Sequence, residues 1–380
     1  MQVTDIRPFA VSIAQSALDD LKDRLGNTRW PERETVDGWD QGVPLEYAQE
    51  LSAYWRDHYD WRRIEARLNS FPNYLATVDG LDIHFIHLRS SNPDARPLIL
   101  THGWPGSVLE FLDVIEPLSA DYSIVVPSLP GYGFSAKPDA AKWSVEHIAA
   151  GWDALMRALG YERYFAQGGD WGSAVTCAIG ANHPDHCAGI HLNMISGRPD
   201  PATMDDLTEE EKAYLARFRW YVEKDNGYSA EQATRPQTIG YGLADSPVGQ
   251  MCWIVEKVHG WSDCGHDVGG QSIGGHPERA LSRDEILDAV SLYWLTNSAA
   301  SSARLYWHSF GKGAARQVDI PTGCSLFPNE IFRLSRRWAE RRFSNIVYWN
   351  SVEKGGHFAA WEQPSLFVDE VRAALSQMQL

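Results

Sequence analysis

The sequence predicts an α/β fold: helices flank a mostly parallel β-sheet, with a helical N-terminal extension and a helical cap inserted into the chain. From residue 73 to 198, short apolar runs alternate with segments of helical period, which is typical of parallel strands covered on both faces. This alternation stops near residue 199 and resumes near residue 313. We therefore expect an extension over 1–72, a core formed by 73–198 and 313–380, and a cap over 199–312.

The extension reads as helices and loops. Ser16 and Asp19 resemble a capping box ahead of leucines at helical spacing, so a first helix is expected to start there. Two further helical patterns occupy 45–58 and 61–68. Nothing in these segments resembles a catalytic pattern, and we expect the extension to wrap around the core.

The core is expected to begin with a hairpin, because alternating apolar residues flank the turn Asp79-Gly80. Short apolar runs separated by helical patterns then predict buried strands. The hairpin and these strands are expected at 74–78, 81–88, 97–100, 122–126, 164–166, 188–192, 323–327 and 345–349, with a helix closing the chain.

The cap is predicted to be helical. Thr208 with Glu211 and Ser282 with Glu285 are capping-box patterns, and Ser246-Pro247 is typical of a helix start. An insertion of this kind is expected over the carboxyl ends of the strands, where open α/β sheets bind ligands.

Composition limits the partners. The chain has 380 residues and a formal net charge of -16, which argues against nucleic acid and anionic membrane surfaces. It lacks an apolar run long enough to span a bilayer and a secretory signal pattern. Its five cysteines are scattered without metal or disulfide spacing, so reduced thiols and a cytoplasmic location are expected.

The stretch Gln-Gly-Gly-Asp-Trp-Gly-Ser at 167–173 separates an apolar run from a helical pattern. A strand, a glycine-bracketed turn and a helix form a nucleophile elbow, whose tip is Asp170 here. A carboxylate at the tip can attack carbon and form an ester with the enzyme. Taken alone, the pattern fits a glycine-rich turn with an N-capping aspartate equally well.

The order of three residues along the chain supports a catalytic role for Asp170. Glu330 follows the predicted strand 323–327, and His357 follows the strand 345–349. Nucleophile, acid and histidine in this order, each after a strand, are the α/β-hydrolase arrangement. Asp319 is an alternative acid, but it precedes its strand and so lies at the wrong end of the sheet.

The residues after the strand at 97–100 add a fourth element. His102, Gly103, Trp104 and Pro105 lie where an α/β-hydrolase places its second oxyanion-hole amide. The backbone amides of Trp104 and Trp171 are therefore expected to converge on one developing oxyanion.

Several stretches together resemble the epoxide hydrolases of the α/β-hydrolase superfamily. In the extension, Thr28-Arg29-Trp30-Pro31 is similar to the microsomal-type branch. Mammalian members of that branch carry a membrane anchor ahead of the extension, and this chain starts without one, so a soluble form is expected. The other matching stretches are His102-Gly103-Trp104-Pro105-Gly106-Ser107, Gly168-Gly169-Asp170-Trp171-Gly172, Thr234-Arg235-Pro236 with Asp245-Ser246-Pro247-Val248-Gly249, and Gly355-Gly356-His357-Phe358.

For ring opening, the resemblance implies that Asp170 attacks one epoxide carbon and forms a hydroxyalkyl ester. Tyr228 and Tyr306 match the two cap tyrosines that donate hydrogen bonds to the epoxide oxygen. A neutral phenol suits donation to a forming alkoxide. Tyr221 and Tyr241 lie close to Tyr228 in sequence and remain alternatives for its position.

For the second step, the resemblance implies that His357 activates water against the ester carbonyl while Glu330 orients the imidazole. The oxyanion would lie on the amides of Trp104 and Trp171. The products implied are a vicinal diol and free enzyme, with no metal or organic cofactor. A homodimer is a family-level expectation, and the role in degradation, detoxification or biosynthesis stays open.

Three other functions share parts of this pattern. A haloalkane dehalogenase uses the same aspartate and histidine, but the Trp-Pro after Gly103 and the two cap tyrosines favour an epoxide. A serine esterase is disfavoured because neither Ser135 nor Ser173 forms G-x-S-x-G. A catalytically silent ligand-binding module is disfavoured because the triad is intact.

One cluster allows a metal-site reading. Asp263-Cys264-Gly265-His266-Asp267 with His276 contains metal-ligand residue types, yet the spacing fits no standard zinc motif. We therefore expect no metal there.

Overall fold

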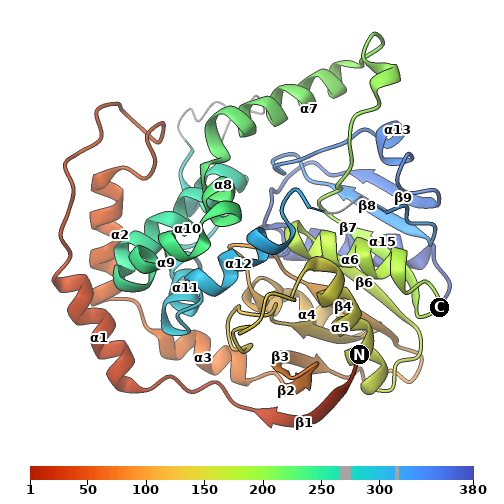
Figure 1. The fold of residues 1–380 in the computed structure, drawn as a ribbon, viewed down its shortest axis with the longest axis horizontal. Coiled ribbons are helices and arrows are strands. Elements are labelled where there is room, and N and C mark those ends of the chain that lie inside the picture. The colour runs from red at the N-terminus through yellow and green to blue at the C-terminus, as the bar shows by residue number, and fades with distance from the viewer. Residues whose placement is uncertain (266–274, 313–315) are drawn as a thin grey trace.

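A computed structural model describes residues 1–265, 275–312 and 316–380. Within these residues, nine strands form one sheet in the order β1-β2-β3-β5-β4-β6-β7-β8-β9 (Figure 1). The pairs from β1 to β3 and the pair β3–β5 are antiparallel, and all pairs from β5 to β9 are parallel. The strands are β1 (Val3–Phe9), β2 (Asn73–Val78), β3 (Leu81–Leu88), β4 (Arg96–Thr101), β5 (Tyr122–Pro127), β6 (Tyr164–Gly168), β7 (Cys187–Leu192), β8 (Thr322–Leu326) and β9 (Ile346–Ser351).

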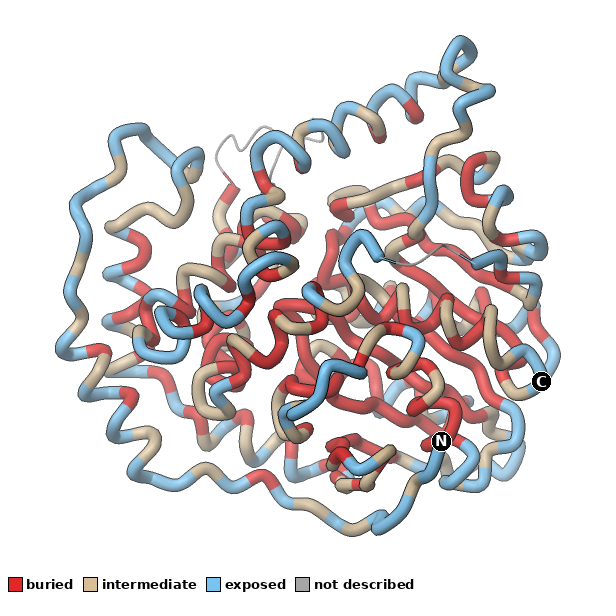
Figure 2. Tube along the Cα trace, in the orientation of Figure 1, coloured by how far each residue is buried: buried red, intermediate tan, exposed pale blue. Residues whose placement is uncertain are grey.

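Helices cover both faces of the sheet, as the buried apolar strands require. Every residue of β5, β6, β7 and β8 is buried, and Figure 2 shows the buried positions concentrated along these strands. Helices α5 and α6 pack together on one face, whereas α4 and α15 pack together on the other. The flanking elements are η1 (Val108–Phe111), α4 (Leu112–Leu118), α5 (Val145–Ala158), α6 (Asp170–Asn182), α13 (Arg336–Ala339), α14 (Ala359–Glu362) and α15 (Pro364–Ser376).

The helices between β7 and β8 lie beside the carboxyl ends of the parallel strands (Figure 1). The capping boxes of Thr208 with Glu211 and of Ser282 with Glu285 are confirmed, and Ser246 caps the helix that starts at Pro247. These elements are η2 (Pro201–Thr203), α7 (Glu209–Trp220), the π-helical turn η3 (Tyr221–Asp225), α8 (Gly227–Thr234), α9 (Pro236–Asp245), α10 (Pro247–Trp261), η4 (Pro277–Arg279), α11 (Arg283–Leu295) and α12 (Ala299–Ser309).

The first residues of the chain contain the strand β1, so reading this region as helices and loops only was wrong. Buried and exposed side chains do not alternate regularly along β1, because Asp5 adopts a φ of 51° and the pairing of β1 with β2 shifts its register between Thr4 and Arg7. The prediction that Ser16 and Asp19 form a capping box was also wrong. Helix α1 begins at Gln15, which places Ser16 inside the helix. The helices of this region are α1 (Gln15–Gly26), α2 (Leu45–Asp57) and α3 (Trp61–Asn69).

The N-terminal helices pack against the helices between β7 and β8 rather than only against the sheet. In Figure 1, α1 and α2 lie along the outer side of α9, α10 and α11. Tyr59 and Arg63 both donate to Asp288 on α11, at 2.7 and 2.6 Å, and Trp55 donates to Ser291 at 2.9 Å. These contacts fasten α11 to the N-terminal region.

No helix among the described residues has the length and apolarity needed to cross a bilayer.

Candidate active site

Asp170 lies at the sharp turn between β6 and α6 and adopts a φ of 50°. This left-handed conformation is strained for a residue with a side chain, and such strain concentrates at functional sites. The turn depends on close backbone approach, since a Cβ on Gly172 would lie 1.8 Å from the Thr101 carbonyl oxygen. A Cβ on Gly168 would lie 2.2 Å from the Gly172 oxygen. The glycines thus allow the tight turn that places Asp170 at the carboxyl end of β6.

The carboxylate of Asp170 is held by backbone amides. The Trp104 amide donates to Oδ1 at 2.8 Å, and the Trp171 amide is a second backbone donor. Burial raises the pKa of Asp170, while the charge of His357 and the two amides oppose this rise. The predicted oxyanion-hole amides therefore lie beside the predicted nucleophile.

His357 and Glu330 form a buried pair. The Nδ1 atom of His357 lies 2.6 Å from Glu330 Oε1, and its Nε2 atom lies 3.5 Å from Asp170 Oδ2. Burial acts to lower the pKa of His357, but the charges of Glu330 and Asp170 outweigh it and raise the pKa to about 9. Asp319, the alternative acid, is exposed and bonds Ser344 instead.

Tyr228 on α8 and Tyr306 on α12 come from different helices and meet over the elbow. Their ring centres are 5.8 Å apart, and the Tyr306 ring lies 4.8 Å from that of Trp171. The Tyr228 ring stacks on Trp104 at 5.0 Å. Burial raises the pKa of both tyrosines well above the usual value, so both phenols are neutral.

The two alternative tyrosines occupy different environments. The Tyr221 hydroxyl lies 3.2 Å from that of Tyr228, whereas Tyr241 is 70% exposed. Only Tyr221 is near the site, and it contacts the site through Tyr228.

The loop after β4 is braced by His102. Burial lowers the pKa of His102 to about 4, so its ring is neutral. Its Nε2 accepts from the Leu129 amide at 3.1 Å, and Nδ1 therefore carries the proton that it donates to the Gly103 carbonyl at 2.9 Å. The Trp104-Pro105 bond is cis. A Cβ on Gly103 would lie 2.3 Å from Asp170 Cβ, so glycine is needed to leave room for that carboxylate.

Sequence reasoning missed residues that join the site through the tertiary fold. Trp261, at the end of α10, lies with its ring 5.1 Å from those of His357 and Tyr228, and its carbonyl accepts from the His357 amide. Glu362 accepts from the Asp263 and Phe358 amides and supports the same loop. No local pattern marks these residues, because the chain contains 16 tryptophans and many glutamates.

Residues of the cluster with metal-ligand residue types, 263–267 with His276, make other contacts. Asp263 accepts from Asn329 Nδ2 at 2.7 Å and from the Gly355 amide at 2.9 Å, which ties the loops of Glu330 and His357 together. His276 caps η4. His266 and Asp267 lie outside the described residues.

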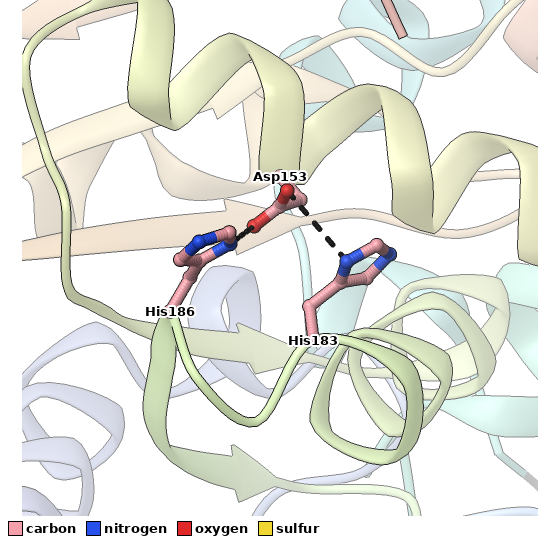
Figure 3. A group of neighbouring side chains, drawn as sticks. All are labelled: Asp153, His183 and His186. Atoms are coloured by element: carbon pink, nitrogen blue, oxygen red, sulfur yellow. Dashed lines mark hydrogen bonds and ion pairs between the residues drawn. The ribbon is translucent and has the colours of Figure 1, made fainter.

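Another group with metal-ligand chemistry lies far from the elbow tip, at the opposite end of α6 (Figure 3). It consists of Asp153, His183 and His186, whose ligand atoms lie within 4.8 Å of one another. Asp153 already accepts from His186 at 2.8 Å, from Arg157 at 3.1 Å and from Tyr164 at 3.1 Å. The guanidinium beside this carboxylate opposes a divalent cation, so the contacts favour a hydrogen-bonded cluster.

A cavity of about 570 Å³ lies beside α12, on a side of this helix that does not carry Tyr306. Its walls include Arg235, Arg304 and Trp143, and neither Asp170 nor His357 lines it. It is therefore separate from the cluster of predicted catalytic residues.

The fold and the elbow define the class of protein as an α/β hydrolase. The family model for the α/β hydrolase fold matches residues 96–237, and the model for the epoxide hydrolase N terminus matches residues 6–111.

Comparison with individual proteins shows which family of α/β hydrolases the chain belongs to. The chain is 51% identical to a candidate epoxide hydrolase of Stigmatella aurantiaca, over 98% of this chain and 85% of the relative. It is 32% identical to epoxide hydrolase 1 of Sus scrofa, over 97% of this chain and 88% of the relative. The solved Aspergillus niger epoxide hydrolase superposes with a TM-score of 0.87 at 33% identity, covering 99% and 97% of the two chains. The chain therefore belongs to the epoxide hydrolases, in the microsomal-type branch that carries the N-terminal region.

Proposed function

We propose that this enzyme converts an epoxide and water into a vicinal diol through a covalent ester on Asp170. The observation that carries the proposal is the position of the Asp170 carboxylate, 3.5 Å from His357 and near enough to Tyr228 and Tyr306 for its charge to act on both phenols. An attacking carboxylate, a base and two neutral phenols are what ring opening followed by ester hydrolysis requires.

In the first step, a carboxylate oxygen of Asp170 attacks one oxirane carbon and the C–O bond to the ring oxygen breaks. The phenols of Tyr228 and Tyr306 donate to that oxygen, which becomes the hydroxyl of a hydroxyalkyl ester. Their neutral state supports this role, since an ionised phenolate has no proton to donate.

In the second step, the ester no longer carries the Asp170 charge that raises the pKa of His357, so the neutral imidazole can act as a base. Water attacks the ester carbonyl carbon of Asp170 and gives a proton to His357. The oxyanion is stabilised by the amides of Trp104 and Trp171, one of which is already 2.8 Å from a carboxylate oxygen. The alkoxide of the diol leaves with the proton from His357. Glu330 orients the imidazole and stabilises its charged form.

The walls of the site favour an epoxide with an apolar group. Aromatic rings from Trp104, Trp171, Trp261, Tyr228 and Tyr306 surround the space near Asp170. Such rings contribute apolar contact area and few hydrogen bonds besides those of the two phenols. We also propose that 1–72, 73–198 with 313–380, and 199–312 act as extension, core and cap.

The test is diol formation from aryl and aliphatic epoxides by the wild type and by Asp170→Ala. Diol is expected from the wild type, with a loss of at least about 10⁴-fold in the variant. One turnover in H₂¹⁸O should put ¹⁸O into Asp170 and leave the first diol unlabelled. Direct labelling of that diol would overturn the ester route. Halide release from haloalkanes at a rate above diol formation would favour a dehalogenase instead.

A further inference from the structure

A small cavity of about 20 Å³ borders Asp170 and His357, and Glu110 forms another part of its wall. Neither Tyr228 nor Tyr306 lines it, so it is distinct from the space where the epoxide oxygen would lie. A cavity of this size has room for about one water molecule, which needs two or more polar partners. Asp170, His357 and Glu110 provide such partners.

Glu110 reaches this cavity through an unusual local arrangement. It is the third residue of η1, and its Oε1 accepts from the Ser107 amide at 3.0 Å. A Cβ on Gly106 would lie 1.4 Å from Glu110 Oε1, so glycine at 106 leaves the space that the carboxyl group occupies. No group among residues 1–265, 275–312 and 316–380 bonds Oε2, which leaves this oxygen available to a water molecule.

We propose that this cavity holds the water that hydrolyses the Asp170 ester, and that Glu110 positions this water together with His357. The inference rests on the proposed ester mechanism. The water donates one hydrogen to His357 Nε2 and the other to Glu110 Oε2, and its oxygen forms the new bond to the ester carbon. The first hydrogen moves to His357 as this bond forms, and Glu110 keeps its hydrogen bond without taking a proton.

Several neighbouring groups act on the pKa of Glu110 during the reaction. Burial raises the pKa of Glu110 to about 8, and the negative charge of Asp170 adds to the rise, while His357 and the Ser107 amide oppose it. Esterification removes the charge of Asp170. That loss lowers the pKa of Glu110, whereas the neutral His357 that accepts the proton no longer opposes the rise, so Glu110 acts here through its position beside the cavity.

A purely structural role for Glu110 is the alternative, because it also completes the capping box of η1. Glu110→Gln separates the two roles. Glutamine keeps the shape and an oxygen for the Ser107 amide, but it turns an NH₂ donor toward the water in place of an acceptor. Ser107→Ala removes the other half of the box, and Glu285→Gln makes the same change in the exposed capping box of α11.

The experiment follows both steps under single-turnover conditions with styrene oxide, or with the best substrate from the epoxide panel. Stopped-flow tryptophan fluorescence reports ester formation, and intact-protein mass after quenching reports the ester. In Glu110→Gln, hydrolysis should slow by about 10- to 100-fold while ester formation stays within about 3-fold, so the ester accumulates. Ser107→Ala and Glu285→Gln should change neither rate by more than about 3-fold.

Unchanged hydrolysis in Glu110→Gln, or equal slowing of both steps, would overturn the role of Glu110. Slowing of the same size in Ser107→Ala would assign the effect to the cap and overturn it as well. His357→Gln distinguishes a failure of the Glu110 proposal from a failure of the ester mechanism. This variant lacks the base for hydrolysis, so it should accumulate the ester whatever the role of Glu110. If His357→Gln forms no ester with any epoxide that the wild type hydrolyses, the proposed mechanism itself fails.

Discussion

The ammonium group of Lys257 lies 4.7 Å from the ring centre of Tyr228. Lys257 is only 2% exposed, and two carboxylates balance its charge: Asp225 Oδ1 lies 2.6 Å from Nζ, and Glu256 Oε1 lies 2.8 Å from it. The other oxygen of Asp225 accepts from the Trp261 indole at 2.6 Å. Asp225 lies at the end of the π-helical turn η3. Together with Lys257 it forms a buried ion pair that contacts both Tyr228 and Trp261, two aromatic residues of the site.

Asp225→Asn should destabilise the protein strongly. It removes the buried one of the two carboxylates that contact Lys257 and leaves only Glu256, whose side chain is 37% exposed. The loss of this charged hydrogen bond costs about 1.5–3 kcal/mol. Thermal unfolding should show a clear drop in midpoint, whereas Asp245→Asn, at a carboxylate whose side chain is 89% exposed, should stay close to the wild type. Equal midpoints for Asp225→Asn and wild type would show that the pair contributes little.

Tyr228→Phe and Tyr306→Phe should each slow ester formation by about 10²-fold, because each removes one donor to the leaving oxygen. The rate constant for ester hydrolysis should change little in either variant. Stopped-flow fluorescence separates these rates, and Tyr241→Phe, at an exposed position, is the matched control. Near-normal ring opening in the double variant contradicts the assigned roles.

The pair of His357 and Glu330 should make stability depend on pH. The pKa of folded His357 is about 9, above the usual value of 6.5. Its stabilisation is thus fully present below pH 6.5 and is lost as pH rises through 9. The gap in thermal midpoint between wild type and Glu330→Gln should narrow across this range. A gap that widens with pH would contradict the raised pKa.

Asp153 should act as a structural hydrogen-bond acceptor. Asp153→Asn is expected to lower the thermal midpoint by a few °C, because it weakens three buried or half-buried hydrogen bonds at once. EDTA should leave the midpoint unchanged, and added ZnCl₂ should not raise it. A stabilisation by zinc that disappears in His183→Ala would instead identify a metal site.

Much of the fold could be predicted because its signals are local. The strands of the core carry continuous apolar runs, and the turn at Asp170 is marked by glycines on both sides. The carboxyl ends of parallel strands meet at one edge, so Glu330 and His357 could be expected near Asp170 from chain order alone.

Other features depend on contacts that no local pattern records. The strand β1 is a mostly exposed edge strand with a bulge, so alternation did not identify it. Trp261 and Glu110 reach the site from the end of a helix and from a capping position, where their residue types are ordinary. Their importance follows from packing and could not be predicted from spacing.

The attachment of α11 to both of its neighbours limits how the enzyme can admit substrate. Asp288 and Ser291 bind the N-terminal helices, and on the same helix Tyr293 donates to the Gly106 carbonyl at 2.9 Å. Swinging this helix away would break buried hydrogen bonds on two sides together. Substrate entry by a swing of α11 would therefore cost stability. Engineering for bulkier epoxides should begin with the side chains around Asp170, since loosening α11 would sacrifice buried hydrogen bonds on both sides.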